Sequence, residues 1–224
     1  MENIFIGLIG SLLLLDTTIL FQSSISQPLI LCSLIGVFFG DIQLGIHVGI
    51  YLQLLWLSSL PIGAAVVPEG NMAAIVSAVM IFRYHQEMQM FHSVLILAVL
   101  FGLLLSFIGG ELVVLYRKNN VTILNRLLNK LHSGDIKSLP STVVFSLVLH
   151  TLLMFILLSV SLYCGDYIFE NVSLLPLMVE EYAYFATIAI LAAGTGLLIH
   201  MYRGLMSRIF ILIGVVVGLL IPMI

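Results

Sequence analysis

The sequence predicts an all-α integral membrane protein, a multi-span helical bundle with broken or re-entrant helices in its N-terminal half. Hydrophobic residues make up 61% of the 224 positions and charged residues only 8%, whereas soluble domains carry about 25% charged residues. Several apolar runs also approach the roughly 20 residues that a helix needs to cross a hydrocarbon core about 30 Å thick. These runs lack the short apolar and polar alternation of a β-barrel, so the spans are predicted to be helical.

Four runs in the C-terminal part of the chain are predicted spans, at residues 94–115, 142–163, 183–199 and 209–224. Between the first two lie five of the eight basic residues, namely Arg117, Lys118, Arg126, Lys130 and Lys137. Because cytoplasmic loops are enriched in Lys and Arg, residues 117–140 are predicted to be cytoplasmic and the acidic residues 166–181 to face outward. Apolar residues at helical intervals predict an amphipathic helix over 122–133 at the membrane surface.

The N-terminal half does not divide into spans of this length. Its apolar pieces are mostly too short and are separated by Gly, Pro and polar residues; they cover about 4–15, 29–39, 44–60, 62–67 and 72–82. Irregular backbone at membrane depth is tolerated only where protein buries it or where it lines a watery cavity, and transporters place substrate sites at such breaks. We therefore predict one membrane domain over 1–224, in which 1–82 is a broken-helix substrate half, 117–140 a cytoplasmic segment and 142–224 the C-terminal spans.

Acidic residues are the first candidates for a substrate site, because the first 82 residues contain no Lys or Arg to pair with them. Asp16 ends a short apolar run, and Gln22 follows about two helical turns later. Asp16 is either a site residue or a helix-capping aspartate. Asp41 belongs to a Gly-Asp pair that predicts a tight turn, so its interpretation is mainly structural.

Three further polar residues interrupt the apolar sequence. Gln53 carries an uncharged amide that can bond substrate hydroxyls without the desolvation cost of an ion, or can bridge two helices. Glu69 follows Pro68 at a break between apolar pieces, and Asn71 stands beside it. Because proline and the start of a helix leave backbone groups free, the functional interpretation is favoured for Glu69 and Asn71.

Catalytic, metal and cofactor chemistry is not predicted. The six histidines never fall in a metal-ligand pattern, and the chain has no phosphate-binding loop, nucleophile elbow or paired-cysteine motif. The formal charge of −3 does not indicate a nucleic-acid partner. A membrane transporter or scaffold is therefore favoured over an enzyme.

Residues 27–80 resemble the IIC subunits of the mannose/fructose/sorbose family of bacterial phosphotransferase-system sugar transporters. Five features carry the resemblance. They are an aspartate-bearing segment (Asp16), a proline-led apolar helix (Gln27-Pro28), a Gly-Asp turn (Gly40-Asp41 with Gly45), a Gly-x-x-Leu run (Gly49–Gln53) and a stretch ending in Pro and an acid (Gly63–Glu69). The chain departs from the family pattern at three of these positions, where Gln53 replaces a glutamate, Glu69 an aspartate and Gln27 an arginine.

The resemblance implies a function and a set of partners. It implies a sugar-translocating subunit of the bacterial cytoplasmic membrane that works with a IID membrane subunit in an oligomeric complex, while soluble IIA and IIB subunits carry and transfer the phosphoryl group. Asp16, Gln22, Gln53, Glu69 and Asn71 would then bind a hexose or related sugar, with no catalytic residue and no metal. Two alternatives stay open, a permease without phosphorylation and a regulatory or scaffolding subunit that has lost transport.

Overall fold

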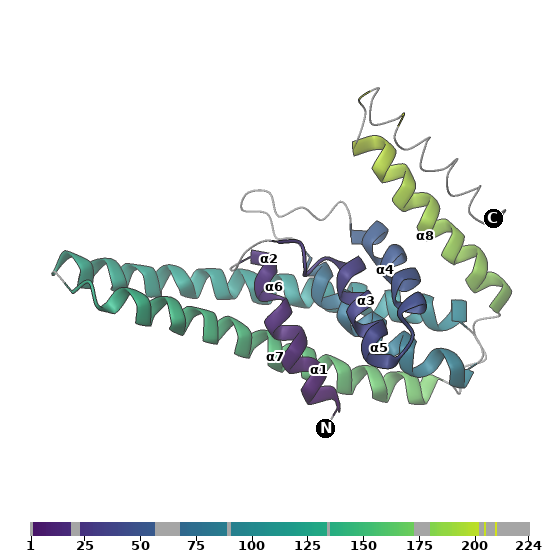
Figure 1. The fold of residues 1–224 in the computed structure, drawn as a ribbon, viewed down its shortest axis with the longest axis horizontal. Coiled ribbons are helices and arrows are strands. Elements are labelled where there is room, and N and C mark those ends of the chain that lie inside the picture. Colours follow the sequence, from purple (N-terminus) through teal and green to yellow (C-terminus); the bar gives the residue numbers. More distant parts are fainter. Residues whose placement is uncertain are drawn as a thin grey trace.

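The computed structural model describes residues 2–18, 23–56, 68–88, 91–133, 135–172 and 180–201, together with Gly204 and Ile209. The described ranges are almost entirely helical (Figure 1). Their helices are α1 (Glu2–Leu13), α2 (Leu15–Thr18), α3 (Pro28–Phe39), α4 (Ile42–Trp56), α5 (Gly70–Met88), α6 (Phe91–His132), α7 (Ser138–Val172) and α8 (Glu180–Met201). The predicted all-α membrane fold is therefore confirmed.

Within the part of the chain that the structure describes, three helices are long and apolar enough to cross a membrane, namely α6, α7 and α8. They contain the predicted spans 94–115, 142–163 and 183–199, whereas the predicted span 209–224 lies outside the described residues except for Ile209. The span at 94–115 and the amphipathic segment at 122–133 form one continuous helix, α6, of 42 residues. At 1.5 Å per residue α6 is about 63 Å long, roughly twice the thickness of a hydrocarbon core.

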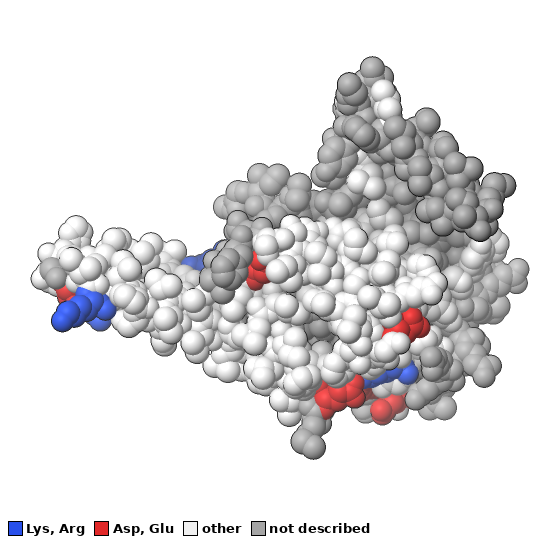
Figure 2. Space-filling view, viewed as in Figure 1, with Lys and Arg blue, Asp and Glu red and all other residues white. Residues whose placement is uncertain are grey.

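The helices α6 and α7 run side by side and project from the rest of the molecule as a long hairpin (Figure 1). Lys and Arg side chains gather toward the tip of this hairpin, while most of the body visible in the same view is uncharged (Figure 2). This distribution of charge agrees with the predicted placement of 117–140 on the cytoplasmic side.

The N-terminal helices α1, α3 and α4 contain 12, 12 and 15 residues, which is shorter than a full span. The helices α3 and α4 form a hairpin whose turn is Gly40, in the left-handed conformation at φ 82°, followed by Asp41. The Asp41 carboxylate accepts a hydrogen bond from the Leu44 amide at 2.9 Å and so caps α4. The structural interpretation of Asp41 is confirmed; that this hairpin is re-entrant stays a prediction.

Glycines allow α3 and α4 to approach closely. A Cβ added to Gly45 would stand 2.6 Å from the Cys32 carbonyl oxygen, and one added to Gly36 would stand 2.7 Å from the Asp41 carbonyl oxygen. Both obstacles are backbone atoms, which cannot rotate aside. Only glycine therefore fits this crossing.

The helix α5 is the centre of the bundle, since it packs against α3, α6 and α7 and nearly all of its residues from Met72 to Ile81 are buried. The Ser77 hydroxyl donates to the Ala98 carbonyl of α6 at 2.8 Å, which satisfies a polar group inside the bundle. The start of α5 lies beside α6, because the backbone amide of Glu69, just before α5, donates to the Ser106 carbonyl at 2.9 Å.

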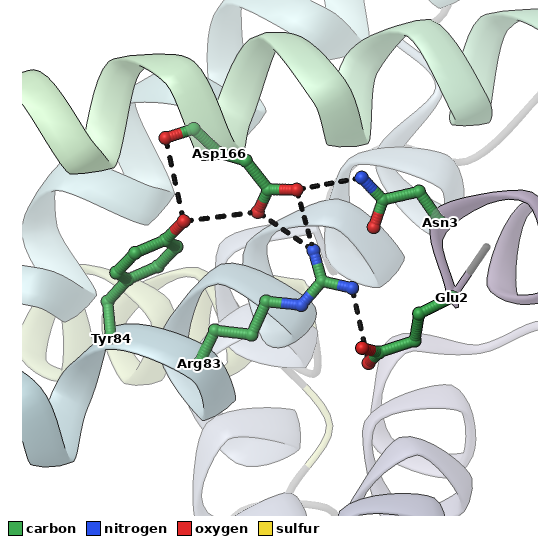
Figure 3. A network of polar contacts seen from close by, with 5 residues as sticks. All are labelled: Glu2, Asn3, Arg83, Tyr84 and Asp166. Carbon is green, nitrogen blue, oxygen red and sulfur yellow. Dashed lines mark hydrogen bonds and ion pairs between the residues drawn. The ribbon is translucent and has the colours of Figure 1, made fainter.

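A charged cluster ties the other end of α5 to α1 and α7 (Figure 3). The Arg83 guanidinium donates to both carboxylate oxygens of Asp166 at 2.8 and 2.9 Å and lies 3.2 Å from Glu2. The Asn3 amide and the Tyr84 hydroxyl also donate to Asp166, at 2.7 and 3.2 Å. Because Asp166 belongs to the predicted outward-facing segment, we expect this cluster to lie at the outer face of the membrane.

The topology predicts that Lys130, near the C-terminus of α6, and Asn171, near the C-terminus of α7, are labelled from opposite sides of the membrane. We expect a single cysteine at Lys130, near the hairpin tip, to react only from the cytoplasm and one at Asn171 only from outside, after Cys32 and Cys164 have been replaced. A membrane-impermeant thiol reagent, applied to intact cells and to inverted vesicles, measures this. Labelling of both positions from one side would contradict the topology.

Candidate functional site

Four of the five predicted site residues lie where three helix ends meet, at the N-termini of α3 and α5 and the C-terminus of α4. We call this region the helix-end junction and define it by Asp16, Ser26, Gln53, Glu69 and Asn71. The fifth predicted residue, Gln22, lies outside the described residues.

Asp16 organises the segment that leads into α3. One carboxylate oxygen accepts from the amide and the hydroxyl of Ser23, both at 2.8 Å. The other oxygen accepts from the amide and the hydroxyl of Ser26 at 3.3 and 3.5 Å. Between them Ser24 adopts a positive φ of 67°, a conformation that costs a non-glycine residue energy. The bonds to Asp16 hold the segment in this shape.

Asn71 connects α5 to this segment. Its side-chain amide donates to the Thr17 hydroxyl at 3.3 Å and to the Ser26 hydroxyl at 3.5 Å. These contacts are long, and no hydrogen bond found among the described residues uses the amide oxygen of Asn71. Asn71 can therefore turn toward a ligand at small cost.

Gln53 pairs with Gln27 across the α3–α4 hairpin. The Gln53 amide nitrogen donates to the Gln27 amide oxygen at 2.6 Å, while the Gln53 amide oxygen accepts from the Leu29 backbone amide at 3.3 Å. Gln27 did not stand among the predicted site residues. Both amides remain accessible, and polar groups at membrane depth face a watery cavity or another protein rather than lipid.

Glu69 begins α5 against the middle of α6. Its backbone amide donates to the Ser106 carbonyl at 2.9 Å, and a Cβ added to Gly109 would stand 2.9 Å from the Glu69 Cβ. Since Ser106 and Gly109 lie within the apolar run 94–115, we expect Glu69 to lie at membrane depth.

Trp56 lies beside the start of α5. A Cβ added to Gly70 would stand 2.6 Å from the Trp56 ring, so the indole packs directly on the α5 backbone. Trp56 follows Gln53 by three residues, which places both on one face of α4. Trp56 did not stand among the predicted site residues, although it is the only tryptophan in the chain and follows Gln53 closely, a signal that could have found it.

Helix geometry adds fixed partial charges to the helix-end junction. At α3 the amides of Leu29, Ile30 and Leu31 already donate to Gln53 and Gln27, but the N-termini of α3 and α5 lie there and carry a positive partial charge. Together with carboxylate and amide side chains they supply both donors and acceptors, which suits a neutral solute rich in hydroxyl groups. Within the described ranges no group of three or more His, Cys, Asp or Glu side chains is arranged to hold a metal ion.

A family model described as the sorbose-specific IIC component of the phosphotransferase system matches residues 1–223. The chain belongs to this IIC family. Membership places this IIC chain among the membrane components of sugar phosphotransferase systems, in the bacterial cytoplasmic membrane.

Curated relatives of this IIC chain carry several sugar names. The mannose-specific EIIC component of Escherichia coli K12 is 37% identical over 70 residues, which is 31% of this chain and 26% of that protein. The sorbose-specific EIIC component of Klebsiella pneumoniae is 38% identical over 61 residues, 27% of this chain and 23% of that protein. The fructose permease IIC component of Bacillus subtilis is 23% identical over 135 residues, 60% and 48% of the two chains. The aligned segments thus cover less than half of each relative.

Two solved structures share the fold over 97% of the IIC chain and 86% of their own chains, each at 24% sequence identity. One is described as a membrane protein and has a TM-score of 0.75. The other is a chain of the mannose transporter ManYZ in complex with microcin E492 and has a TM-score of 0.62. At this identity the likeness establishes the fold alone.

Proposed function

We propose that this protein is the sugar-translocating IIC subunit of a mannose-family phosphotransferase system, and that it moves a hexose or related sugar inward by alternating access. The observation that carries the proposal is the helix-end junction, where the Gln27–Gln53 pair, Glu69 and Asn71 are gathered at membrane depth in a chain of the IIC family. A stable fold has no need of so many polar groups there, since polar side chains at membrane depth are costly unless they face a watery cavity or another protein.

Each group at the helix-end junction has a proposed part in binding. Gln53, Glu69 and Asn71 hydrogen-bond sugar hydroxyls, and the Trp56 ring covers an apolar face of the sugar. The Asp16 carboxylate accepts hydrogen bonds from Ser23 and Ser26. Asp16 therefore positions the segment before α3 and does not bind the sugar itself. Gln22 stays a candidate on its sequence position alone.

The proposed partners follow from the family. A IID membrane subunit covers the polar surface that the short N-terminal helices leave accessible, and IIA and IIB subunits supply and transfer the phosphoryl group in the cytoplasm, on a partner rather than on this chain. A solved relative in the mannose transporter ManYZ supports a two-component membrane complex. We propose a larger oligomer on the same ground.

Uptake of a radiolabelled hexose by cells that express the chain with all partner subunits tests the proposal. We expect accumulation of sugar phosphate that depends on this chain and on the IIB subunit. Uptake of unphosphorylated sugar would instead indicate the non-phosphorylating permease, and a complete system that transports equally well without this chain would refute a transport role.

Alanine at Gln53 or at Glu69 is expected to weaken sugar binding about ten- to hundredfold, because a substrate hydroxyl left unpaired in a desolvated site costs about 1 to 3 kcal/mol. Gln43→Ala, on the same helix near the Asp41 turn, is the matched control and should leave binding unchanged. Equilibrium binding to the purified membrane complex measures the effect. If both variants assemble and bind all accepted sugars normally, these side chains only pack helices.

The variant Gln53→Glu tests whether Gln53 contributes to sugar binding or only to the packing of the α3–α4 hairpin. A glutamate still accepts from the Leu29 amide, and the Gln27 amide can rotate to donate to it, so the hairpin is retained. We therefore expect normal assembly with changed sugar selectivity or transport rate. An unchanged substrate profile would remove Gln53 from the binding site.

A further inference from the structure

The side-chain amide of Gln53 has one favourable orientation in the α3–α4 hairpin. Its oxygen accepts from the backbone amide of Leu29, in the first turn of α3, at 3.3 Å. A backbone N–H donates and cannot accept, so the rotated amide would place two donors against each other. The Gln53 oxygen therefore stays on Leu29, and the Gln53 amide nitrogen faces the other way, toward Gln27.

The orientation of Gln53 determines that of Gln27. The Gln53 nitrogen lies 2.6 Å from Gln27, and because an amide nitrogen only donates, the Gln27 atom that it meets is the side-chain oxygen. The amide nitrogen of Gln27 is then directed away from Gln53. No hydrogen bond within the described ranges uses this nitrogen, and Gln27 is exposed. Gln27 therefore presents a free donor at the start of α3.

The backbone around Gln27 is held on both sides. The Gln27 backbone amide donates to the Ser24 carbonyl at 3.1 Å. The Gln27 backbone carbonyl accepts from the amides of Ile30 and Leu31, both at 3.0 Å. The buried Pro28 restricts the residue before it to the extended region, and Gln27 has φ −66° and ψ 142°. Because the backbone and the side-chain oxygen are both bonded, the free nitrogen loses little freedom when it binds a ligand.

The groups near Gln27 determine which ligand atom suits its donor. Ser26, the residue before Gln27, accepts from the Asn71 amide at 3.5 Å, so the starts of α3 and α5 are neighbours. At the start of α5, the Glu69 carboxyl group and the unused amide oxygen of Asn71 supply acceptors. A hydroxyl group can accept one hydrogen bond and donate another through the same oxygen. A ligand hydroxyl between the two helix starts can therefore bond to both.

We propose that the amide nitrogen of Gln27 donates a hydrogen bond to one hydroxyl oxygen of the bound hexose and so determines substrate specificity. This inference rests on the proposed function, because it assigns a further contact within the same sugar site. One hydroxyl of the substrate is then selected both as an acceptor, by Gln27, and as a donor, by the start of α5. A site of this kind rejects an analogue that leaves its polar groups unpaired.

Deoxy and deoxyfluoro analogues of the hexose test this contact, because fluorine accepts a hydrogen bond weakly but cannot donate one. The sugar is whichever of mannose, fructose and sorbose the purified membrane complex binds most tightly, and equilibrium binding is measured with each hydroxyl replaced in turn. In the parent protein we expect one position at which the deoxy analogue binds about tenfold more weakly than the sugar. At this position the deoxyfluoro analogue should bind several-fold more tightly than the deoxy analogue.

Two variants that reverse the free donor make the test specific. In Gln27→Glu one carboxylate oxygen still accepts from Gln53, but the other replaces the donor. In Gln53→Glu the Gln27 amide rotates to donate to the new carboxylate and presents its oxygen instead. In both variants the deoxyfluoro analogue should bind no better than the deoxy analogue. Gln43→Glu, which adds the same charge at the exposed start of α4, is the matched control and should keep the parent pattern.

A neutral variant, Gln27→Met, keeps the side-chain length without any hydrogen bond and should also lose the preference for fluorine. Three results overturn the assignment of Gln27 and leave the proposed function standing. They are a parent protein that binds hexose but shows no such position, a preference for fluorine that persists in Gln27→Glu and Gln27→Met, and loss of assembly in both, which would place the Gln27 contact on the membrane partner. A parent complex that binds no hexose would refute the proposed function as well.

Discussion

Replacing Arg83 by methionine is expected to destabilise the protein by about 3 to 5 kcal/mol, the usual cost of removing one partner from a buried ion pair. The methionine leaves Asp166 without its bidentate partner, and the side chains of Arg83 and Asp166 are only 15% and 22% exposed. Glu2, at 50% exposure, can regain water and so contributes little of the loss. Thermal unfolding of the detergent-solubilised chain measures the change.

Two further variants identify the cause of the Arg83 effect. Arg83→Lys keeps the charge, but one ammonium group cannot reproduce the contacts of Nη1 with Asp166 and of Nη2 with Glu2, so we expect an intermediate loss. Combining Arg83→Met with Asp166→Leu removes the stranded carboxylate and should recover much of the stability. If Arg83→Met unfolds at the parent temperature, the cluster in Figure 3 does not hold α1, α5 and α7 together.

Replacing Asp16 by alanine is expected to abolish measurable sugar binding and to reduce stability. The variant removes the acceptor for the amides and hydroxyls of Ser23 and Ser26. Ser26 is buried, so each of its donors left unsatisfied costs about 1 to 3 kcal/mol, whereas the donors of the exposed Ser23 lose less. Without these bonds the strained conformation at Ser24 relaxes and the N-terminus of α3 moves away from Asn71.

Asp41→Ala is the matched control for the Asp16 variant, because Asp41 caps α4 through one hydrogen bond to Leu44. We expect this control to cost about 1 kcal/mol of stability and to leave sugar binding intact. We measure equilibrium sugar binding and thermal unfolding of both variants on the same preparations. The comparison distinguishes a role of Asp16 in positioning the segment before α3 from a general loss of stability. Normal binding by Asp16→Ala would show that the segment before α3 does not shape the site.

The sequence was a good guide to the long helices because hydropathy is a local property. Residues 94–115, 142–163 and 183–199 fall inside α6, α7 and α8. The continuity of α6 through 122–133 was less evident, since a change from apolar to amphipathic composition alters the surroundings of a helix without ending it. No proline interrupts that stretch, and this was the available signal.

The helix-end junction was only partly predictable. Polar residues in apolar surroundings pointed to Gln53, Glu69 and Asn71, because such residues are costly without a purpose. Gln27 and Trp56 were not predicted as site residues, because little in the local sequence distinguishes them. Only the folded α3–α4 hairpin and the start of α5 place them beside the predicted site residues. Arg83 and Asp166 stand 83 positions apart, and no local pattern pairs residues at that separation.

The position of a bound hexose in a structure of this chain with its membrane partner tests the central claim most directly. The account predicts sugar at the helix-end junction, within hydrogen-bonding distance of Gln53, Glu69 or Asn71 and against the Trp56 ring. A hexose bound elsewhere, for example only between α6 and α7 or only to the partner subunit, would contradict it.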